Sequence, residues 1–313
     1  MSSSSFYPPL LPEGGRIGLV SPSRWAAPAR LKALKNALES RGLEVVVHPQ
    51  NEQRYGWLAG AAKDRAAAIM DMFLDPSIDA IMCVRGGTGA LEILPLLDYK
   101  AIAAHPKPFV GYSDITCLLH AITRHTGMVT YHGMMSWQEG RFDPRSLEDS
   151  FHVISCGSQA KSLTFPQAHV RREGCATGPL IGGNLSLLSC LAGTDYLCCP
   201  KEFILFVEDV DEPLYVLDRT LTHLRLAGFL ESVSAVIVGE MCDIEDETPN
   251  PDEPPEAWFG QSLEVIIEKH IPSHVPLAFN VPCGHGAYVT TLPFGAMVKT
   301  VFSKSGLSVS FAP

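Results

Sequence analysis

A serine in residues 111–114 (Gly-Tyr-Ser-Asp) has the sequence context of a nucleophile. Phe109 and Val110 before it are typical of the end of a buried strand, and apolar residues recur at helical spacing behind it. A strand-to-helix turn lifts a side chain out of the sheet and points unpaired helical N–H groups at the reacting atoms. Ser113 is therefore a candidate nucleophile, with a helix N-cap as the alternative role. The pattern departs from the Gly-x-Ser-x-Gly elbow, because Ile115 stands where the second glycine belongs.

A serine nucleophile requires a base, and the base requires an acceptor that orients it. Of the eleven histidines, His285 lies between two glycines, where its ring can project from a tight loop. His48 and His120 fall within strand or helix patterns, while His132 follows a strand and could line a crevice. Glu208 directly follows an apolar strand, where a carboxylate can be held at a pocket rim. A solvated acidic loop is the alternative, since further carboxylates follow Glu208.

Glycines follow another apolar strand in residues 85–89 (Arg-Gly-Gly-Thr-Gly). The N–H groups of Gly86 and Gly87 could bind an oxyanion or a phosphate, or the pair could simply form a tight turn. Arg85 could bind a substrate carboxylate through a two-point fork, or form a structural ion pair.

Strand and helix patterns alternate through the first half of the chain, which predicts a parallel sheet covered on both faces. Ligands bind such sheets at the carboxyl ends of the strands, so Ser21, Arg85 and Ser113 are expected to line one crevice. The expected strands are 16–20, 44–48, 80–84 and 109–110, and the expected helices are 29–40, 61–74 and 90–97.

The composition of the sequence changes after residue 133. Residues 136–174 are polar, and apolar residues rarely recur there with a regular period. We expect an N-terminal α/β domain over residues 1–150, a linker or covering segment over 151–175, and a second domain over 176–313. In that second domain the patterns predict strands 203–207 and 235–238, helices 215–228 and 261–270, and a hairpin over 298–311.

Composition limits the possible partners. The 313 residues are 46% hydrophobic and 19% charged, as in a globular protein, and the formal net charge of -10 argues against nucleic acid. The N-terminus lacks the basic and apolar regions of a signal peptide, and no apolar run approaches the ~18 residues that span a bilayer. The nine cysteines lack framework spacing, which favours reduced thiols in the cytoplasm. Phosphate-loop and zinc-ligand spacings are also missing, so we expect no cofactor, metal or membrane partner.

Five motifs, in order, resemble the LD-carboxypeptidase family of serine peptidases. The resemblance implies an N-terminal flavodoxin-like domain, similar to class I glutamine amidotransferases, and a C-terminal swivelling β/β/α domain. It also implies a triad of Ser113, Glu208 and His285, with an oxyanion hole from the N–H groups of Gly87 and Asp114. One departure is Thr88, where family members often carry tyrosine. The motifs lie at residues 85–89, 111–116, 182–185, 207–213 and 284–286.

The resemblance further implies a cytoplasmic, homodimeric carboxypeptidase without a cofactor, which releases the terminal D-alanine of murein tetrapeptides during peptidoglycan recycling. Arg85 and Asn184 are then expected to contact this peptide substrate. A close rival is the microcin C immunity branch of the family, which cleaves an amide in a peptidyl- or aminoacyl-nucleotide, with Trp137 as the candidate residue for stacking on the base. A more distant rival is a ligand-binding protein that has kept the fold without catalysis.

Overall fold

A six-stranded sheet forms the centre of the first half of the molecule. The computed structural model describes residues 5–137, 140–246 and 259–311. The strands of this sheet are β1 (Arg16–Val20), β2 (Glu44–Val47), β3 (Ala80–Cys83), β4 (Phe109–Gly111), β5 (Thr130–His132) and β12 (Leu292–Phe294). Their order is β12-β5-β4-β3-β1-β2, and all pairs are parallel except β12 with β5. The first five strands thus have the flavodoxin-like order 2-1-3-4-5, and the expected parallel sheet is confirmed.

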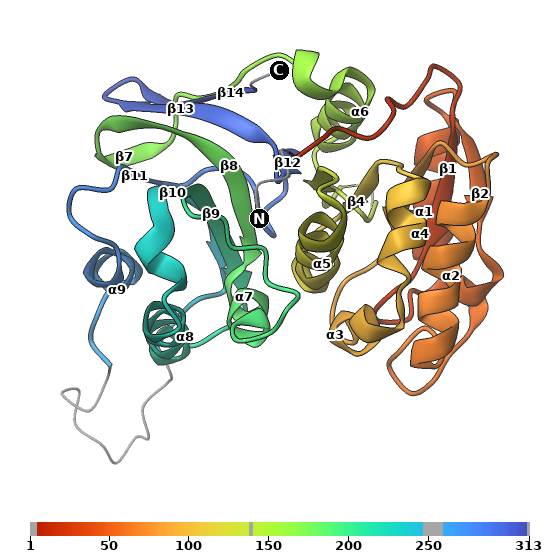
Figure 1. Ribbon diagram of the computed structural model, residues 1–313, viewed down its shortest axis with the longest axis horizontal. Coiled ribbons are helices and arrows are strands. Elements are labelled where there is room, and N and C mark those ends of the chain that lie inside the picture. Colours follow the sequence, from red (N-terminus) through yellow and green to blue (C-terminus); the bar gives the residue numbers. More distant parts are fainter. Residues whose placement is uncertain (1–4, 138–139, 247–258, 312–313) are drawn as a thin grey trace.

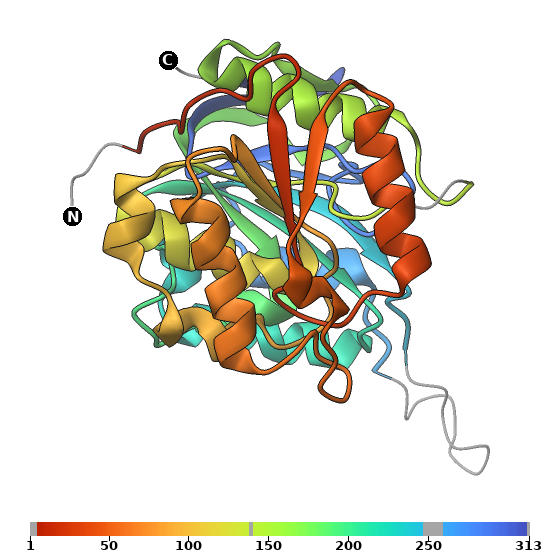
Figure 2. The same ribbon diagram turned by 90° about the vertical axis from the view of Figure 1, so that its right-hand side faces the viewer.

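Helices cover both faces of this sheet. Figure 2 shows α1 and α2 on opposite sides of β1 and β2. The inner strands β3 and β4 are short, apolar and fully buried, as expected of a sheet covered on both faces, whereas the edge strand β2 is more exposed. The helical segments are α1 (Pro28–Glu39), η1 (Pro49–Glu52), α2 (Ala62–Leu74), α3 (Ala90–Ile93), η2 (Leu94–Leu96), α4 (Tyr99–Ala104), η3 (Ser113–Ile115) and α5 (Thr116–Thr126).

An eight-stranded mixed sheet organises the second half. Its strands are β6 (Leu163–Phe165), β7 (His169–Arg172), β8 (Gly174–Asn184), β9 (Phe203–Val210), β10 (Val233–Cys242), β11 (Leu277–Phe279), β13 (Met297–Ser303) and β14 (Gly306–Phe311). The order is β6-β14-β13-β8-β9-β10-β11-β7, with β8 to β11 parallel and the flanking pairs antiparallel. The expected hairpin is β13 and β14.

Three helices of the second half pack against one another in a row. α7, α8 and α9 lie side by side below the strands in Figure 1. These segments are α6 (Arg145–Cys156), η4 (Gly157–Gln159), α7 (Leu185–Leu191), α8 (Leu214–Leu226), η5 (Phe229–Ser232) and α9 (Leu263–His270). Among the described residues, no helix has both the length and the apolar character needed to cross a bilayer.

Two segments join the halves more closely than the sequence indicated. Residues 151–175, expected to be a linker or covering segment, hold the end of α6 together with β6 and β7, which are strands of the second sheet. β12 comes from the C-terminal part of the chain but completes the first sheet beside β5. The division at residues 150 and 176 remains a prediction about domains.

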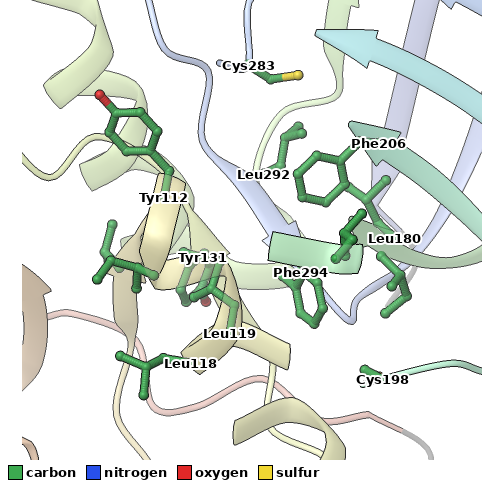
Figure 3. Packing of buried hydrophobic residues seen from close by; sticks show 14 of the residues in the cluster. Tyr112, Leu118, Leu119, Tyr131, Leu180, Cys198, Phe206, Cys283, Leu292 and Phe294 are labelled. Atoms are coloured by element: carbon green, nitrogen blue, oxygen red, sulfur yellow. The ribbon is translucent and has the colours of Figure 1, made fainter. Parts of the chain in front are cut away.

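One apolar core runs between the two sheets. α5 packs against α7 and β8, and Figure 3 shows side chains of α5, β5, β8 and β12 in contact across this boundary. Phe294 of β12 is fully buried, and its ring centroid lies 4.6 Å from that of His120 on α5. The Thr116 hydroxyl at the start of α5 accepts the N–H of Asn184 at the end of β8, at 3.1 Å. These contacts hold the ends of β4 and β8 against each other.

Candidate active site

Ser113 occupies a strained turn between β4 and α5. Its φ of 62° lies in the left-handed region, which is uncommon for a residue with a side chain and is concentrated at functional sites. The loop after β3 lies directly against it. A Cβ built on Gly86 would stand 3.0 Å from the Cβ and 3.1 Å from the Oγ of Ser113, so a glycine is needed for this approach. The serine hydroxyl therefore faces the glycine loop, as a nucleophile beside an oxyanion site must.

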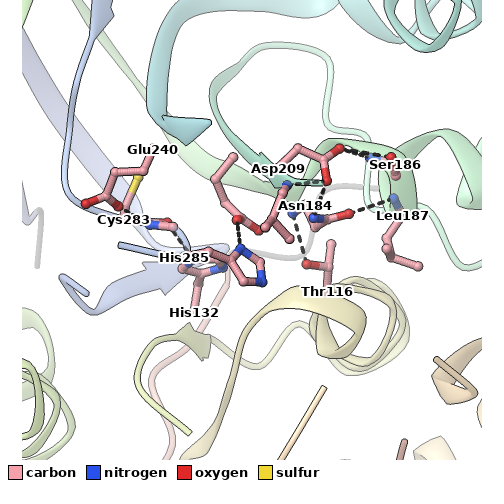
Figure 4. A network of polar contacts seen from close by, with 12 residues as sticks. Thr116, His132, Asn184, Ser186, Leu187, Asp209, Glu240, Cys283 and His285 are labelled. Carbon is pink, nitrogen blue, oxygen red and sulfur yellow. Dashed lines mark hydrogen bonds and ion pairs between the residues drawn. The ribbon is translucent and has the colours of Figure 1, made fainter. Parts of the chain in front are cut away.

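His285 and Glu208 form a hydrogen-bonded pair from sequence positions 77 residues apart. The distance from His285 Nδ1 to Glu208 Oε2 is 2.6 Å, and His285 lies within the polar network of Figure 4. A carboxylate can only accept, so Nδ1 carries the hydrogen and Nε2 of the neutral ring is left to act as a base. Glu208 is fully buried, and its Oε1 has no partner among the described residues.

The charges around this pair favour protonation of the imidazole. Burial by itself lowers the pKa of His285, but the hydrogen bond and charge of Glu208, with weaker help from Asp209 and Glu240, raise it above its ordinary value of 6.5. Burial raises the pKa of Glu208. A histidine that gains basicity from a buried acceptor is suited to receive a proton during a reaction.

Two residues outside the predicted site hold the loop that carries His285. Glu240 Oε2 accepts the N–H of Gly284 at 2.8 Å, and His132 Nε2 donates to the carbonyl of Cys283 at 2.9 Å. A Cβ on Gly284 would lie 2.8 Å from the carbonyl oxygen of Glu240 and 3.0 Å from the Cβ of Glu208, which explains the glycine. Burial lowers the pKa of His132 to about 4, so this histidine is a neutral support rather than a rival base.

The sequence contains a signal for the position of Glu240. Glu240 comes two residues after the apolar run 235–238, with Gly239 between, much as Glu208 directly follows 203–207. In the structure β9 and β10 are parallel neighbours, so both carboxylates come to the same edge of the sheet.

His285 also lies beside the turn that carries the serine. Its ring centroid is 5.1 Å from that of Tyr112, the residue before Ser113. Between these described residues, no hydrogen bond joins the Ser113 hydroxyl to His285. Bonds between nucleophile and base are commonly long without substrate and shorten in the complex.

The predicted oxyanion donors are neighbours in sequence of groups at the serine: Gly87 follows Gly86, which approaches Ser113, and Asp114 follows Ser113 itself. Gly87 has a φ of 115°, and within the described part of the chain neither backbone N–H donates to an acceptor.

The Asp114 carboxylate has a separate role that the sequence did not reveal. Its Oδ2 accepts the Ser23 hydroxyl at 2.5 Å and the N–H of Ala90 at 2.9 Å. It thereby ties the loops after β1 and β3 to the nucleophile turn, and burial raises its pKa.

The side chains of Asn184 and Ser21 form hydrogen bonds within the protein. The Asn184 side chain accepts the N–H of Leu187 at 3.2 Å as the N-cap of α7, and donates to Asp209 at 2.8 Å. These bonds leave its predicted contact with substrate without support from the geometry. Ser21 is buried and donates to Asn51 at 2.6 Å, so the expectation that it lines the crevice is wrong.

Arg85 and Trp137, two side chains predicted to contact a substrate, are both partly buried. Arg85 is half-buried and donates to the carbonyl of Trp25 at 3.0 Å, with no ion pair to a carboxylate of the described residues. Trp137 is partly buried, and the guanidinium carbon of Arg41 lies 6.0 Å from its ring centroid, next to the end of α1. No group of three metal-ligating side chains occurs within the ranges that the structure describes.

Comparisons with known proteins show the family of the chain. The models of the LD-carboxypeptidase N-terminal and C-terminal domains match residues 17–133 and 177–300. The murein tetrapeptide carboxypeptidase of Pseudomonas aeruginosa is 35% identical over 91% of this chain and 92% of its own. The probable murein peptide carboxypeptidase of Bacillus subtilis is 32% identical, covering 98% of this chain and 97% of its own.

A solved structure shows the same fold. The microcin C7 self-immunity protein MccF superposes with a TM-score of 0.85 at 23% identity, over 99% of both chains. Fold and sequence together define a two-domain α/β peptidase. The chain belongs to the LD-carboxypeptidase family, so the resemblance and the fold class predicted from the sequence are confirmed.

Proposed function

We propose that this protein is a serine carboxypeptidase that releases the terminal D-alanine of murein tetrapeptides, using Ser113, His285 and Glu208 as its triad. The observation that carries the proposal is the 2.6 Å bond between His285 and buried Glu208, beside a serine held at a φ of 62°. The substrate class is supported by the names of the relatives from Pseudomonas aeruginosa and Bacillus subtilis.

In the first step, the Ser113 hydroxyl attacks the carbonyl carbon of the amide bond before D-alanine. His285 Nε2 accepts the hydroxyl proton, and Glu208 stabilises the imidazolium through the bond to Nδ1. The negative charge that develops on the carbonyl oxygen is bound by the N–H groups of Gly87 and Asp114. Loss of one such donor costs roughly 3 kcal/mol of transition-state stabilisation.

In the second step, the imidazolium of His285 protonates the leaving amine, and free D-alanine departs. The acyl group is left as an ester on Ser113. A water molecule, deprotonated by the same imidazole, then hydrolyses this ester and releases the tripeptide. The cycle consumes one water and restores the neutral histidine, so the residues of this chain suffice for the reaction.

The cellular setting completes the proposal. We assign the protein to peptidoglycan recycling in the cytoplasm, as a homodimer. All nine cysteines are free thiols, which suits a reducing compartment. Cell fractionation, and light scattering during size-exclusion chromatography, test compartment and assembly; a monomer in solution would contradict the second assignment.

The triad is tested by D-alanine release from a synthetic tetrapeptide. We expect Ser113→Ala and His285→Gln each to lower kcat by at least about 10³-fold, because these two side chains exchange the proton. We expect Glu208→Gln to lower kcat by roughly 10²–10⁴-fold, because Glu208 orients the imidazole ring of His285. His105→Gln, an exposed histidine at the end of α4, is the matched control and should keep full turnover. If Ser113→Ala keeps its turnover, the serine mechanism is wrong; absence of any turnover in the unmodified protein would favour the non-catalytic rival.

The microcin-type rival is separated by a parallel assay. Aspartyl sulfamoyl-adenosine is offered beside the tetrapeptide at equal concentration. We expect faster cleavage of the tetrapeptide, since the Trp137 ring already lies against Arg41 and packs with Phe142 instead of standing free to stack on a base. Preferential cleavage of the nucleotide amide would select the rival.

A further inference from the structure

Three polar side chains on one face of α6 bond to the segment that follows His285. They are Ser146, Asp149 and Ser150, and their spacing of three and four residues places them side by side on a helix. Ser146 and Ser150 are buried, and Asp149 is partly buried. Figure 1 shows α6 where the two halves of the molecule meet. The helix lies between the two ranges matched by the domain models, so its role does not follow from the family match.

The loop that carries His285 depends on neighbouring groups for its shape. It is closed at its neck, where the N–H of Thr290 donates to the carbonyl of Pro282 at 2.8 Å. Within the loop a glycine precedes His285 and another follows it, and glycine restricts the backbone less than any other residue. Glu240 and His132 hold the half that precedes the histidine. The half that follows needs separate support if the imidazole is to keep a fixed position.

That second half is hydrogen-bonded to α6 and to the residue two positions before it. The four bonds run from the Asp143 N–H to the Ala287 carbonyl at 2.8 Å, from the Tyr288 hydroxyl to the Asp149 carboxylate, from the Val289 N–H to the Ser146 hydroxyl at 2.9 Å, and between the hydroxyls of Ser150 and Thr291 at 2.5 Å. The guanidinium carbon of Arg145 also lies 5.0 Å from the ring centroid of Tyr288. Because hydrogen bonds fix direction as well as distance, this row of bonds sets the course of the loop more sharply than apolar contacts would.

A small apolar cluster joins the same segments, apart from the main core. Val289 is fully buried there, against residues of α6 and of the segment before it. The buried members of the cluster are Ala37, Met134, Phe142, Leu147 and Val289. A change on the polar face of α6 should therefore alter the loop without opening the core between the two sheets.

We propose that α6 positions the base, His285, and that Ser146 and Asp149 are its positioning residues. Ser146 acts through the N–H of Val289. Asp149 acts through the hydroxyl of Tyr288. Such support matters because a displacement of about 1 Å at a reacting group can cost roughly 10²-fold in rate. The inference rests on the proposed function, since it takes the histidine as the base of a serine peptidase.

The first test removes the bond between Asp149 and Tyr288 from either side. We expect Asp149→Ala and Tyr288→Phe each to lower kcat for D-alanine release by about tenfold, with KM unchanged within about twofold, because the base moves while the groups that bind substrate stay. Asp149→Asn keeps an oxygen that accepts the hydroxyl and should restore most of the loss. The double variant should be no slower than either single variant, since both remove the same bond. Ser146→Ala, which removes the acceptor of the Val289 N–H, should act in the same direction.

Two further readouts follow His285 directly and need no peptide. The 2.6 Å bond to Glu208 shifts the Nδ1 proton of His285 far downfield in the NMR spectrum, and its absence from His285→Gln identifies it. We expect this resonance to move or broaden in Asp149→Ala and Tyr288→Phe, and to keep its place in Asp149→Asn. The second readout is the reaction of Ser113 with a fluorophosphonate, in which Oγ bonds to phosphorus, fluoride leaves and His285 takes the proton. Its rate should fall by the same factor as kcat.

Glu148→Gln is the matched control, because it removes an exposed carboxylate from the neighbouring position of α6; all three readouts should stay unchanged. Thermal melting shows which variants are folded, and Tyr288→Phe, which loses a single oxygen atom, decides the result if Asp149→Ala does not fold. An unchanged Nδ1 resonance together with an unchanged labelling rate would overturn the inference, as would a lower melting temperature as the only effect. If the unmodified protein reacts with the fluorophosphonate but releases no D-alanine, the proposed function fails, and the resonance and the labelling rate still decide the role of α6.

Discussion

At the scale of single residues, the chemistry of His285 depends on which carboxylates surround it. Glu208 orients the ring directly, at 2.6 Å, whereas Glu240 acts through the backbone of the loop, by accepting the N–H of Gly284. Both carboxylates lie at the ends of neighbouring parallel strands, and both contribute negative charge that raises the pKa of His285. Glu240 is therefore a positioning residue with an electrostatic effect that can be measured separately.

Glu240→Gln should move the acid limb of the kcat/KM profile to lower pH. The base must be neutral, so activity is lost as the pH falls through the pKa of His285. Removing the negative charge of Glu240 lowers that pKa, while the glutamine oxygen can still accept the Gly284 N–H. The measurement is kcat/KM against pH for the two proteins.

Two other variants serve as controls for the pH profile of Glu240→Gln. Glu231→Gln, at an exposed glutamate of η5, should leave the profile in place. Glu240→Ala removes the acceptor as well as the charge, so it should also lower kcat. A profile for Glu240→Gln that stays fixed, or moves to higher pH, would contradict the assigned effect of this charge.

Ser113 stores backbone strain that glycine would release. The left-handed conformation costs an L-residue roughly 1 kcal/mol relative to glycine. Ser113→Gly should therefore be more stable than Ser113→Ala by about 1 kcal/mol in urea unfolding, although both lack the nucleophile. Equal free energies of unfolding would show that the turn is not strained in solution.

At the scale of elements, the site is an assembly of loops tied together by one carboxylate. Asp114 links the loops after β1 and β3 to the turn before α5, through Ser23 and Ala90. Removing a buried acceptor leaves its donors unpaired, and each such loss costs about 1–3 kcal/mol. The glycine loop and the nucleophile turn then lose their common anchor, so stability and turnover should fall together.

Asp114→Ala should lower the free energy of unfolding by about 2–4 kcal/mol, as two buried donors lose their acceptor. It should also lower kcat, although the backbone N–H proposed for the oxyanion hole remains. The matched control is Asp98→Ala, at the exposed N-cap of α4, which should cost about 1 kcal/mol without changing kcat. If both variants lower kcat equally, the anchor role of Asp114 is wrong.

At the scale of the whole molecule, the two sheets share a core and a strand. β12 pairs with β5 of the first sheet, while β13, three residues later, pairs with β8 of the second. Phe294 of β12 is fully buried, close to His120 of α5 and 6.5 Å from the ring centroid of Phe206 on β9. The halves that contribute Ser113 and His285 are therefore coupled through packing as well as through the site.

Phe294→Ala should destabilise both halves at once. A buried phenylalanine truncated to alanine costs about 3–5 kcal/mol, and we expect one shared unfolding transition shifted by that amount. Calorimetry and urea unfolding with two spectroscopic probes measure this. Leu226→Ala, at an exposed position of α8, is the control with little effect. Two separate transitions, with only one displaced by Phe294→Ala, would show that the sheets unfold independently.

Much of the fold could be predicted from the sequence, since its signals are local. Alternating apolar strands and amphipathic helices indicated the parallel sheet, and the hairpin turn indicated β13 and β14, because each depends on residues near one another in the chain. Strand ends and a glycine-flanked loop likewise made Ser113, Glu208 and His285 candidates, and the family resemblance joined them into a predicted triad. The sequence did not reveal that β12 pairs with a strand of the first sheet, because the residues of a three-residue strand do not indicate which strand it pairs with.

The sequence by itself determined which residue types stand at the ends of the strands, and with them the family and the candidate triad. Only the tertiary structure decided which of these groups meet. Ser23 and Asp114 are 91 residues apart, and Glu240 and Gly284 are 44 apart, yet each pair is joined by a hydrogen bond. The physical reason is that a hydrogen bond or a repulsion depends on distance in space, and the packing of the two sheets sets that distance.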